Sequence, residues 1–232
     1  KWIAELLLAG DIGALQEKQK EYIGDLYASS KRMIDLVNSL LNIARIESAE
    51  IKIKSELVDL ASVYSEVIKE FESLLVQRRH SLSLELKKDF LKFKTDYNLF
   101  YEILKNLISN AIKYTSDGGT IKIGASVSGE EAVIFVKDNG LGIPSSQQSR
   151  IFQKFFRADN VVRINTDGTG LGMFIVKSLV DLLEGRIWFE SEENKGTTFY
   201  VALPLGGIHE REGTKTLVEI EERGNKKMNM EK

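Results

Sequence analysis

The sequence contains no cysteine, only two prolines and only two histidines. Without cysteine, disulfides and thiolate metal sites are excluded. His80 and His209 lie too far apart in the sequence to indicate a local metal cluster. Long hydrophobic runs are also missing, because the apolar stretch at residues 2–10 is interrupted by Glu5 and is far too short to span a bilayer. This stretch also lacks the charged start and the cleavage site of a signal peptide.

These absences predict a cytoplasmic protein with no membrane contact in this chain, although the cytosolic part of a membrane-anchored protein would have the same composition. An excess of one charge is lacking too, since 32 Lys and Arg face 34 Asp and Glu, for a net charge of −2. This balance argues against nucleic acid or an anionic membrane as the main partner. The 232 residues are enough for one large or two smaller domains with a substantial core.

The first fifty residues show helical periodicity. Residues 1–9 read as the end of a helix that has no N-cap, and the glycines at 10 and 13 interrupt the pattern. Residues 17–47 then read as one long amphipathic helix, which is either packed on its own domain or part of a bundle. Its length favours a bundle or coiled coil. Its apolar or small seam positions are Tyr22, Leu26, Ser29, Met33, Val37, Leu40 and Ala44.

Helices and strands alternate in the rest of the chain. Short strand-like stretches at 51–54 and 57–60 come first, and Gly185 is expected to form a left-handed C-cap after the last helix. The pattern predicts an α+β protein, in which a helical hairpin is followed by an α/β two-layer sandwich. The expected divisions are 1–50, 51–205 and a charged appendage at 206–232, where residues 214–220 could form one more strand. The predicted helices are 61–77, 96–114 and 171–183, and the predicted strands are 81–86, 120–127, 132–136, 186–191 and 197–204.

The helix at 96–114 carries a polar face that its apolar stripe leaves unused. Asn106, Asn110 and Lys113 are spaced four and three residues apart, so they share one side of the helix. An amide oxygen at Asn110 suits Mg²⁺, which prefers hard oxygen ligands and shares them with substrate phosphates. Lys113 can meet a phosphate, and Tyr114 can lie along a nucleoside. Taken alone, the same residues could be an ordinary polar helix surface.

Asp138 follows the apolar strand at 132–136, where a carboxylate can accept a hydrogen bond from the exocyclic amine of adenine. Guanine offers a carbonyl at that position, so the carboxylate would select adenine. Gly140 and Gly142 allow close approach of the backbone and a positive φ. In isolation this segment would be read as a common Asp-Asn-Gly turn.

The glycine-rich run at 168–172 opens the helix at 171–183. A dinucleotide-binding interpretation fails, because residues 158–167 before it are polar and irregular rather than a strand, and no Walker-type phosphate loop is present. A helix N-terminus still suits phosphate oxygens. Residues 158–167 would then form a mobile lid, with Arg157 at its base reaching the terminal phosphate.

These motifs, in this order, resemble the N, G1, F and G2 boxes of sensor histidine kinases, within the ATPase group shared with gyrase, Hsp90 and MutL. The resemblance extends to about residue 205 and implies binding of ATP and Mg²⁺, with Asn110 as the metal ligand and Lys113 and Arg157 as catalytic groups. The nucleotide-binding residues that it implies are Asn106, Asn110, Lys113, Tyr114, Asp138, Gly140, Gly142, Ile143, Phe156, Arg157, Gly168, Thr169, Gly170, Leu171, Gly172 and Thr198.

Residues 40–48 resemble the end of the second helix of a histidine kinase dimerisation domain, which implies a homodimer through the hairpin and a response regulator receiver domain as partner. Neither histidine has the setting of the family's phosphoacceptor, so that box is expected upstream of Lys1 and this chain is not expected to autophosphorylate alone. One alternative is a nucleotide-binding dimeric scaffold without kinase activity. A related ATPase or serine kinase is the other, and the hairpin argues against it.

Overall fold

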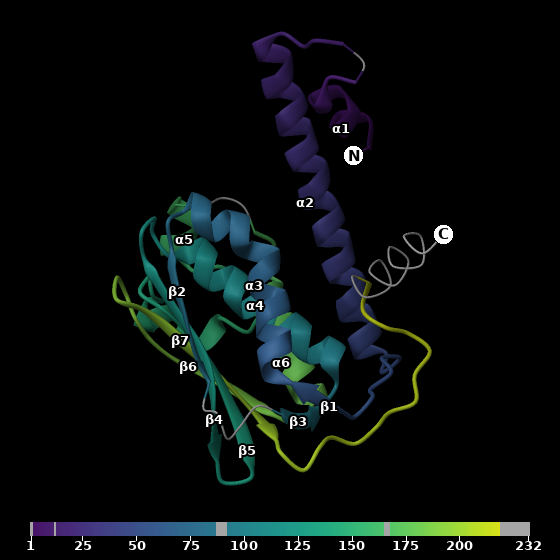
Figure 1. The fold of residues 1–232 in the computed structure, drawn as a ribbon, viewed down its shortest axis with the longest axis vertical. Helices are drawn as coiled ribbons and strands as arrows, with labels where there is room; N and C mark the ends of the chain where they lie inside the picture. The colour runs from purple at the N-terminus through teal and green to yellow at the C-terminus, as the bar shows by residue number, and fades with distance from the viewer. Residues whose placement is uncertain (1, 12, 87–91, 165–167, 219–232) are drawn as a thin grey trace.

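The computed structural model describes residues 2–11, 13–86, 92–164 and 168–218. One long helix, α2, extends beyond a second region in which a curved sheet carries helices on one face (Figure 1). This arrangement confirms the predicted fold class, a helical hairpin followed by an α/β sandwich.

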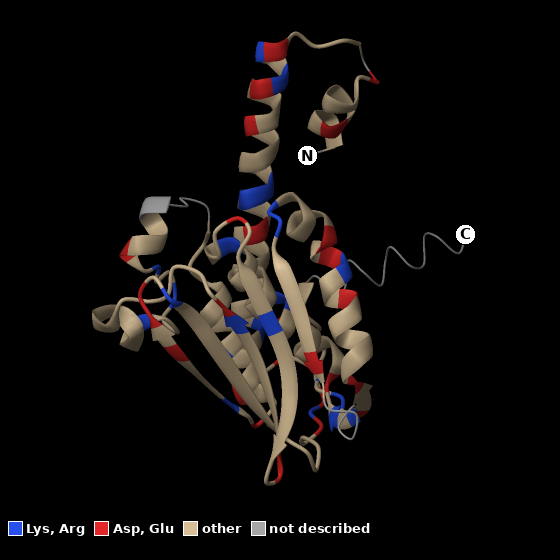
Figure 2. Cartoon of the chain, turned by 60° about the vertical axis from the view of Figure 1, so that its left-hand side comes forward, with Lys and Arg blue, Asp and Glu red and all other residues tan. Residues whose placement is uncertain are grey.

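The hairpin consists of α1 (Trp2–Ala9) and α2 (Glu17–Glu47). The start of α2 is fixed by the Gln19 side chain, which accepts a hydrogen bond from the backbone N–H of Gln16 at 2.9 Å. The Tyr27 hydroxyl donates to Glu5 at 3.0 Å and joins the two helices. Lys, Arg, Asp and Glu residues, in blue and red, gather at the outer end of α2 (Figure 2). Within the described residues, no helix combines the length and apolar character needed to cross a bilayer.

A five-stranded sheet in the order β2-β4-β5-β7-β6 forms one layer of the second region. β2 and β4 pair in parallel, and the other neighbours pair antiparallel. A small antiparallel pair, β1 (Glu56–Asp59) with β3 (Lys92–Thr95), lies beside it. The strands of the main sheet are β2 (Ser81–Leu86), β4 (Thr120–Ser128), β5 (Glu131–Asp138), β6 (Arg186–Glu192) and β7 (Gly196–Pro204).

Helices α3 (Leu60–Gln77), α4 (Tyr97–Tyr114) and α6 (Gly172–Leu182) cover one face of this sheet (Figure 1). Helix α4 lies between the other two, in contact with both α3 and α6. The fully buried side chains of Phe100, Leu104 and Ile108 on α4 show that this helix is the centre of the core. Two short helices, η1 (Ser145–Arg150) and α5 (Asp159–Ile164), lie between β5 and α6 in the sequence.

Buried Asp96 starts α4 and also ties the helix to the linker after α2. One carboxylate oxygen accepts from the Leu99 N–H at 3.0 Å, as expected of an N-cap, and the other accepts from the Lys54 N–H at 2.8 Å. Burial raises the pKa of Asp96, and these backbone hydrogen bonds lower it in part. The N-terminus of α4, the helix that carries Asn106 and Asn110, is therefore fixed by the Asp96 carboxylate, whose two oxygens both accept hydrogen bonds from the backbone.

The structure corrects three details of the predicted elements. Strand β3 was not predicted, and residues 51–54 form two isolated bridges instead of a strand, in which Ile51 pairs with Lys215 and Ile53 with Arg211. The left-handed residue after α6 is Glu184, with φ 56°, and not Gly185. A side chain at 185 is excluded for another reason, because a Cβ there would lie 2.4 Å from the Ala202 carbonyl oxygen.

Residues 206–218 of the predicted charged appendage pack against the rest of the fold. Ile208 and Leu217 are buried, and a bridge forms at Lys215 within the segment predicted as one more strand. The remainder of that predicted strand, 219–220, and the rest of the appendage lie outside the described residues.

Candidate nucleotide-binding site

The polar face of α4 lies against the N-terminal end of α6. The Asn106 side-chain amide donates to the Glu102 carbonyl at 2.9 Å, and its Oδ1 would lie 3.1 Å from a Cβ built at Gly172. One turn further, Asn110 donates from Nδ2 to the Met173 sulfur at 3.2 Å. This donor assignment presents the Asn110 amide oxygen as the remaining ligand atom.

The first turn of α6 can receive an anion. Its N-cap is Leu171, whose side chain is fully buried and makes no cap hydrogen bond. The Thr169 hydroxyl instead accepts from the Leu171 N–H at 3.3 Å. A helix start without a side-chain cap directs backbone N–H groups and the positive end of the helix dipole outward. The structure thus brings a helix N-terminus and two Asn side chains together, although they are far apart in the sequence.

Asp138 ends β5 with its side chain buried. Its Oδ1 accepts from the Gly140 N–H at 2.9 Å and from the Thr197 N–H at 3.2 Å. Burial raises the pKa of this carboxyl, and the two backbone hydrogen bonds lower it in part. Because both donors reach the same oxygen, Oδ2 is the atom placed to accept from a ligand.

The glycines after Asp138 are required by close packing. A Cβ at Gly140 would lie 2.2 Å from the Tyr114 carbonyl oxygen, which accepts from the Leu141 N–H at 3.0 Å. Gly142 has φ 60°, and a Cβ there would lie 2.0 Å from the Glu192 carbonyl oxygen. The half-buried Ile143 donates its N–H to the Ser191 hydroxyl at 2.9 Å. The loop is thereby held between the end of α4 and the β6–β7 turn.

The glycine run at 168–172 packs on the segment that contains Arg157. Gly170 has φ 69°, and a Cβ there would lie 2.6 Å from the Phe155 carbonyl carbon. Phe155 itself has φ 63° and is 60% exposed, so the backbone in this corner is held in a rarely adopted conformation. A Cβ at Gly168 would lie 3.4 Å from the Arg157 guanidinium.

Arg157 and Tyr114 face the same space. Burial raises the pKa of the Tyr114 hydroxyl, and the positive charge of Arg157 opposes that shift. Lys113 is exposed at the edge of the same helix end. The other predicted aromatic, Phe156, packs on the core with the Arg150 guanidinium 4.6 Å from its ring centre. Its side chain therefore has a packing role that does not depend on a ligand.

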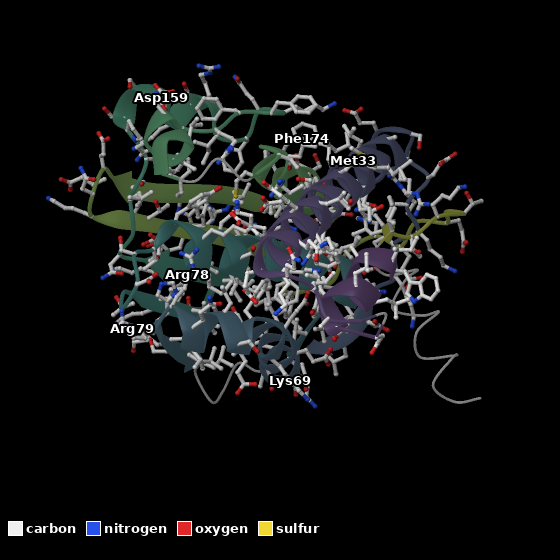
Figure 3. The ribbon with its side chains drawn as sticks, turned by 90° about the horizontal axis from the view of Figure 1, so that it is seen from above. Met33, Lys69, Arg78, Arg79, Asp159 and Phe174 are labelled. Atoms are coloured by element: carbon white, nitrogen blue, oxygen red, sulfur yellow. The ribbon has the colours of Figure 1, made fainter. Side chains whose placement is uncertain are left out.

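Residues 158–167, predicted to be irregular, contain the short helix α5. Two side chains hold this helix to the loop after β5. The Asn160 amide donates to the Gly142 carbonyl at 3.0 Å, and Gln147 exchanges two hydrogen bonds with Asp159, at 2.6 and 3.0 Å. Asp159 lies at the edge of the molecule opposite Lys69 of α3 in the view from above (Figure 3). Residues 165–167 of the predicted lid lie outside the described residues.

Thr198 lies on the other face of the sheet from Asp138. It pairs with Lys137 in β5 and with Glu190 in β6, and cross-strand partners project from the same face. Thr197, which sequence reasoning did not select, is the residue that binds the Asp138 carboxylate, and its hydroxyl lies 2.8 Å from the Ser191 hydroxyl. The sequence alone could not have identified it, because the contact depends on which strand lies beside the end of β5.

An open hollow of about 410 Å³ lies at the ends of β5, β6 and β7. Asp138 and Thr198 line it, together with Lys137, Lys195 and Glu190, whereas Asn106 and Asn110 do not. Among the described residues, no group of three or more His, Asp or Glu side chains could hold a metal ion by itself. A divalent cation at Asn110 would therefore need oxygen ligands from a substrate, which is the usual situation for Mg²⁺ with nucleotides.

The sequence of this region matches a known family. The family described as "Histidine kinase-, DNA gyrase B-, and HSP90-like ATPase" matches residues 95–207, which run from the start of α4 to beyond the end of β7. The chain thus contains an ATPase domain of this type. The match includes every residue of the predicted nucleotide site.

Comparison with individual proteins narrows this class. The circadian input-output histidine kinase CikA of Synechococcus elongatus is 33% identical over 204 residues, which are 87% of this chain and 27% of that protein. Sensor histidine kinase WalK of Bacillus subtilis is 34% identical over 177 residues, 75% of this chain and 29% of WalK. Full-length ShkA in complex with AMPPNP superposes with a TM-score of 0.72 at 25% identity, covering 90% of this chain and 43% of ShkA.

The chain is thus homologous to sensor histidine kinases over most of its length and contains the ATPase domain of that family. It spans less than a third of the length of these two curated relatives. The similarity to CikA extends over most of the chain, beyond the ATPase domain alone.

Proposed function

We propose that this chain is the catalytic core of a sensor histidine kinase, in which residues 1–50 form a dimerisation hairpin and residues 51–205 bind Mg-ATP. The observation that carries the proposal is the contact of Asn106 and Asn110 with the first turn of α6. This contact joins a hard metal ligand to an anion-binding helix end, which is the combination that a magnesium-bound triphosphate needs.

The phosphates would lie over the start of α6, where they would accept from the backbone N–H groups of its uncapped first turn. Asn110 would hold Mg²⁺ through its amide oxygen, with Asn106 beside it. Lys113 and Arg157 would neutralise the charge that develops on the transferred phosphoryl group. The ion supplies charge neutralisation between the phosphates when it is bound. The protein groups mainly position the nucleotide, as is usual in phosphoryl transfer.

The base would lie between Asp138 and the loop at 140–143. Asp138 would accept from the adenine amine through Oδ2, since its Oδ1 already serves two backbone donors. Tyr114 would lie along the nucleoside. The site residues come from α4, the loop after β5 and the α6 N-terminus, so a bound nucleotide would contact all three segments.

Homodimerisation through the hairpin is supported by the apolar surface of α2. The predicted seam residues Tyr22, Leu26 and Met33 are 69%, 61% and 68% exposed. Val37 and Leu40 continue the same stripe and are also exposed. A stripe of this length on a lone helix has too few contacts to be stable in water, and a second hairpin would cover it as one half of a four-helix bundle.

In the full protein, the γ-phosphoryl group would pass to a histidine and then to an aspartate of a response regulator receiver domain. Neither histidine of this chain is placed for the first step. His80 precedes β2 and lies 3.2 Å from the Ser116 carbonyl oxygen, and His209 follows β7. We therefore expect this chain to bind ATP without forming phosphohistidine. A dimeric nucleotide-binding scaffold would share the binding site and differ only in this transfer.

Substitution Asn110→Ala tests the metal site. Calorimetric titration of ATP should show a loss of roughly tenfold or more in the presence of Mg²⁺ and a smaller loss in EDTA. Asn98→Ala is the matched control, because Asn98 is an exposed amide in the first turn of the same helix. The control should bind like the unsubstituted chain in both buffers. An equal loss with and without Mg²⁺ for Asn110→Ala would contradict the metal assignment.

A further inference from the structure

Residues 207–218, called the strap below, run from the end of β7 back to α2. In Figure 1 the yellow segment leaves the sheet at its lower end and rises beside the lower part of α2. The strap pairs with the linker between α2 and β1. Ile53 and Arg211 exchange both backbone hydrogen bonds, at 3.0 and 3.1 Å, and Lys215 binds the backbone of Lys52 and Glu50 on either side of Ile51.

The far end of the strap binds α2 directly. The Arg45 guanidinium donates to the Thr216 carbonyl at 2.5 Å, and the Val218 N–H donates to the Asn42 side-chain oxygen at 2.9 Å. Asn42 and Leu217 are 4% and 1% exposed. Asn42 is polar and buried, and its side-chain oxygen accepts a hydrogen bond from the strap, while Leu217 of the strap is buried as well. The strap end therefore packs on α2 as part of the core.

The near end of the strap binds the ATPase domain. The His209 N–H and ring nitrogen lie 3.1 and 2.7 Å from one Glu184 oxygen, in the turn between α6 and β6. Glu210 accepts from the Ser55 N–H at 3.2 Å, and Ile208 is buried. The strap thus contacts the ATPase domain, the linker and α2 in order along twelve residues.

Gly213 shows that the strap sequence is fitted to this path. A Cβ built at Gly213 would lie 2.5 Å from both the Glu50 carbonyl oxygen and the Lys52 nitrogen. Backbone atoms of the linker cannot give way as a flexible side chain would, so only glycine allows the strap to lie this close. By contrast, a Cβ built at Gly206, just before the strap, would meet no atom within 4 Å.

We propose that the strap is an intramolecular brace that fixes the ATPase domain against the lower end of α2. Without it, the two regions would be connected only by the covalent linker at 48–55 and by the direct contact of the lower part of α2 with α6 and Lys154. With the strap in place, the linker is paired with a second segment, and that segment also binds α2 through Asn42 and Arg45. The proposal goes beyond nucleotide binding, and the brace would limit how far the domain swings along the hairpin. Its consequence for phosphoryl transfer rests on the proposed function, but the mechanical role does not.

Distances between spin labels test the brace. Because the chain has no cysteine, Lys31→Cys on α2 and Val76→Cys on α3 create one labelled pair, and both positions are exposed. Labelled chain is mixed with excess unlabelled chain, so that only distances within one molecule are measured. The unsubstituted strap should give one narrow distance distribution. Gly213→Val should widen it roughly twofold or more, and the matched control Gly206→Val should leave it narrow.

Hydrogen exchange provides the second readout, together with a second variant, Leu217→Ala. In either strap variant, the amides of Lys52 and Ile53 should exchange about tenfold faster or more, while amides of the central strands β4 and β5 keep their protection. Retained protection in β4 and β5 also shows that the ATPase domain is folded. A narrow distance distribution and unchanged linker exchange in the folded variants would overturn the brace. Equal broadening by Gly206→Val would overturn it as well.

ATP titration separates this proposal from the proposed function. The strap variants should bind ATP like the unsubstituted chain, because no strap residue belongs to the nucleotide site. If Asn110→Ala loses ATP binding and keeps a narrow distance distribution, the substitution has affected the nucleotide site and not the brace. If a strap variant widens the distance distribution and binds ATP normally, the substitution has affected the brace and not the nucleotide site.

Discussion

Helices α2 and α4 use their apolar residues in opposite ways. The 31 residues of α2 bury only Asn42 and Ile43, both near its end. The 18 residues of α4 bury a run of side chains on almost every turn, including Phe100, Leu104 and Ile108. The apolar residues of α2 instead remain on the surface, with Met33 68% exposed. A helix owes most of its stability to the packing of its apolar face, so α4 is stabilised along its whole length within this chain, whereas α2 is stabilised only near its C-terminal end.

The core of the ATPase domain is complete, whereas most of the apolar stripe of the hairpin is exposed. In the ATPase domain the sheet and three helices close one continuous cluster of buried side chains. Within the described residues α2 contacts α1 and, near its lower end, α6, and these contacts leave most of the stripe exposed. Substitutions should therefore act on folding in the first region and on association in the second. The following predictions test that division.

The largest effect is expected from the pair Phe100→Ala and Met33→Ala. Phe100 is fully buried and packs edge-on against Phe93 at 5.4 Å, so its truncation should lower the free energy of unfolding by about 3–5 kcal/mol. Met33→Ala should change the unfolding of dilute chain by no more than about 0.5 kcal/mol. Its effect should appear as weaker self-association in sedimentation. A large loss of stability in the dilute Met33 variant would show that the hairpin is stabilised within one chain.

The sequence allowed the ends of α2 and α4 to be predicted because their periodicity is long. The pattern for 17–47 matches α2, and Asp96 marks the start of α4 as a side-chain cap. Strand β3 escaped because its four residues, Lys92 to Thr95, alternate with charge and carry one aromatic. Short segments of this kind are defined by their partner, here β1, which a single sequence does not show.

The same reason limits the prediction of the site and of residues 206–218. The sequence places Asn106 and Asn110 on one helix face and Gly172 in a separate glycine motif, and the structure shows which atoms of the two motifs approach each other. Thr197 was missed because its backbone N–H reaches the Asp138 carboxylate only when β7 lies beside β5. The charged composition of 206–218 predicted an appendage, but its two buried apolar residues, Ile208 and Leu217, decide its packing. Composition averages over a segment, whereas burial depends on individual side chains.

Asp138→Asn should separate binding from stability within the ATPase domain. Loss of one charged, buried hydrogen bond is worth roughly 1.5–3 kcal/mol, so ATP affinity should fall about tenfold or more. Stability at neutral pH should not fall, because burial raises the pKa of Asp138 and its ionised form is disfavoured in the fold. Asparagine keeps an Oδ1 acceptor for the Gly140 and Thr197 N–H groups.

The pH dependence checks the sign of this effect. An acid with a raised folded-state pKa contributes stability below its unfolded pKa, and that contribution is lost as the pH rises through the folded-state pKa. The stability difference between the unsubstituted chain and Asp138→Asn should therefore favour the variant more at pH 7 than at pH 4 in thermal unfolding. Unchanged ATP affinity in calorimetry would remove Asp138 from the site.

A smaller effect is expected from Tyr64→Phe, with Tyr22→Phe as its match on α2. Tyr64 is fully buried and donates to the Gly124 carbonyl at 2.9 Å, so removal of its hydroxyl should cost about 1 kcal/mol. Tyr22 is 69% exposed, and loss of its hydroxyl should leave stability unchanged. Burial also raises the pKa of Tyr64, so its contribution should be lost only in strong alkali. Equal denaturation midpoints for the two variants would contradict the division between regions.

The smallest effect is expected where the two regions meet, at the ion pair of Glu47 on α2 with Lys154. The atoms are 2.6 Å apart, but the side chains are 55% and 37% exposed, so solvent screens the pair. Glu47→Gln should therefore cost less than about 1 kcal/mol, and less still in 1 M salt. Lys154→Gln should cost more than Glu47→Gln, because Lys154 also lies 4.8 Å above the Phe174 ring, a contact worth about 0.5–1 kcal/mol at an exposed site. A double-mutant cycle by urea unfolding separates the two contributions, and Glu17→Gln, which breaks the exposed pair with Lys20 inside α2, is the control. A coupling energy well above 1 kcal/mol would mean that this contact, and not the strap, holds α2 to the ATPase domain.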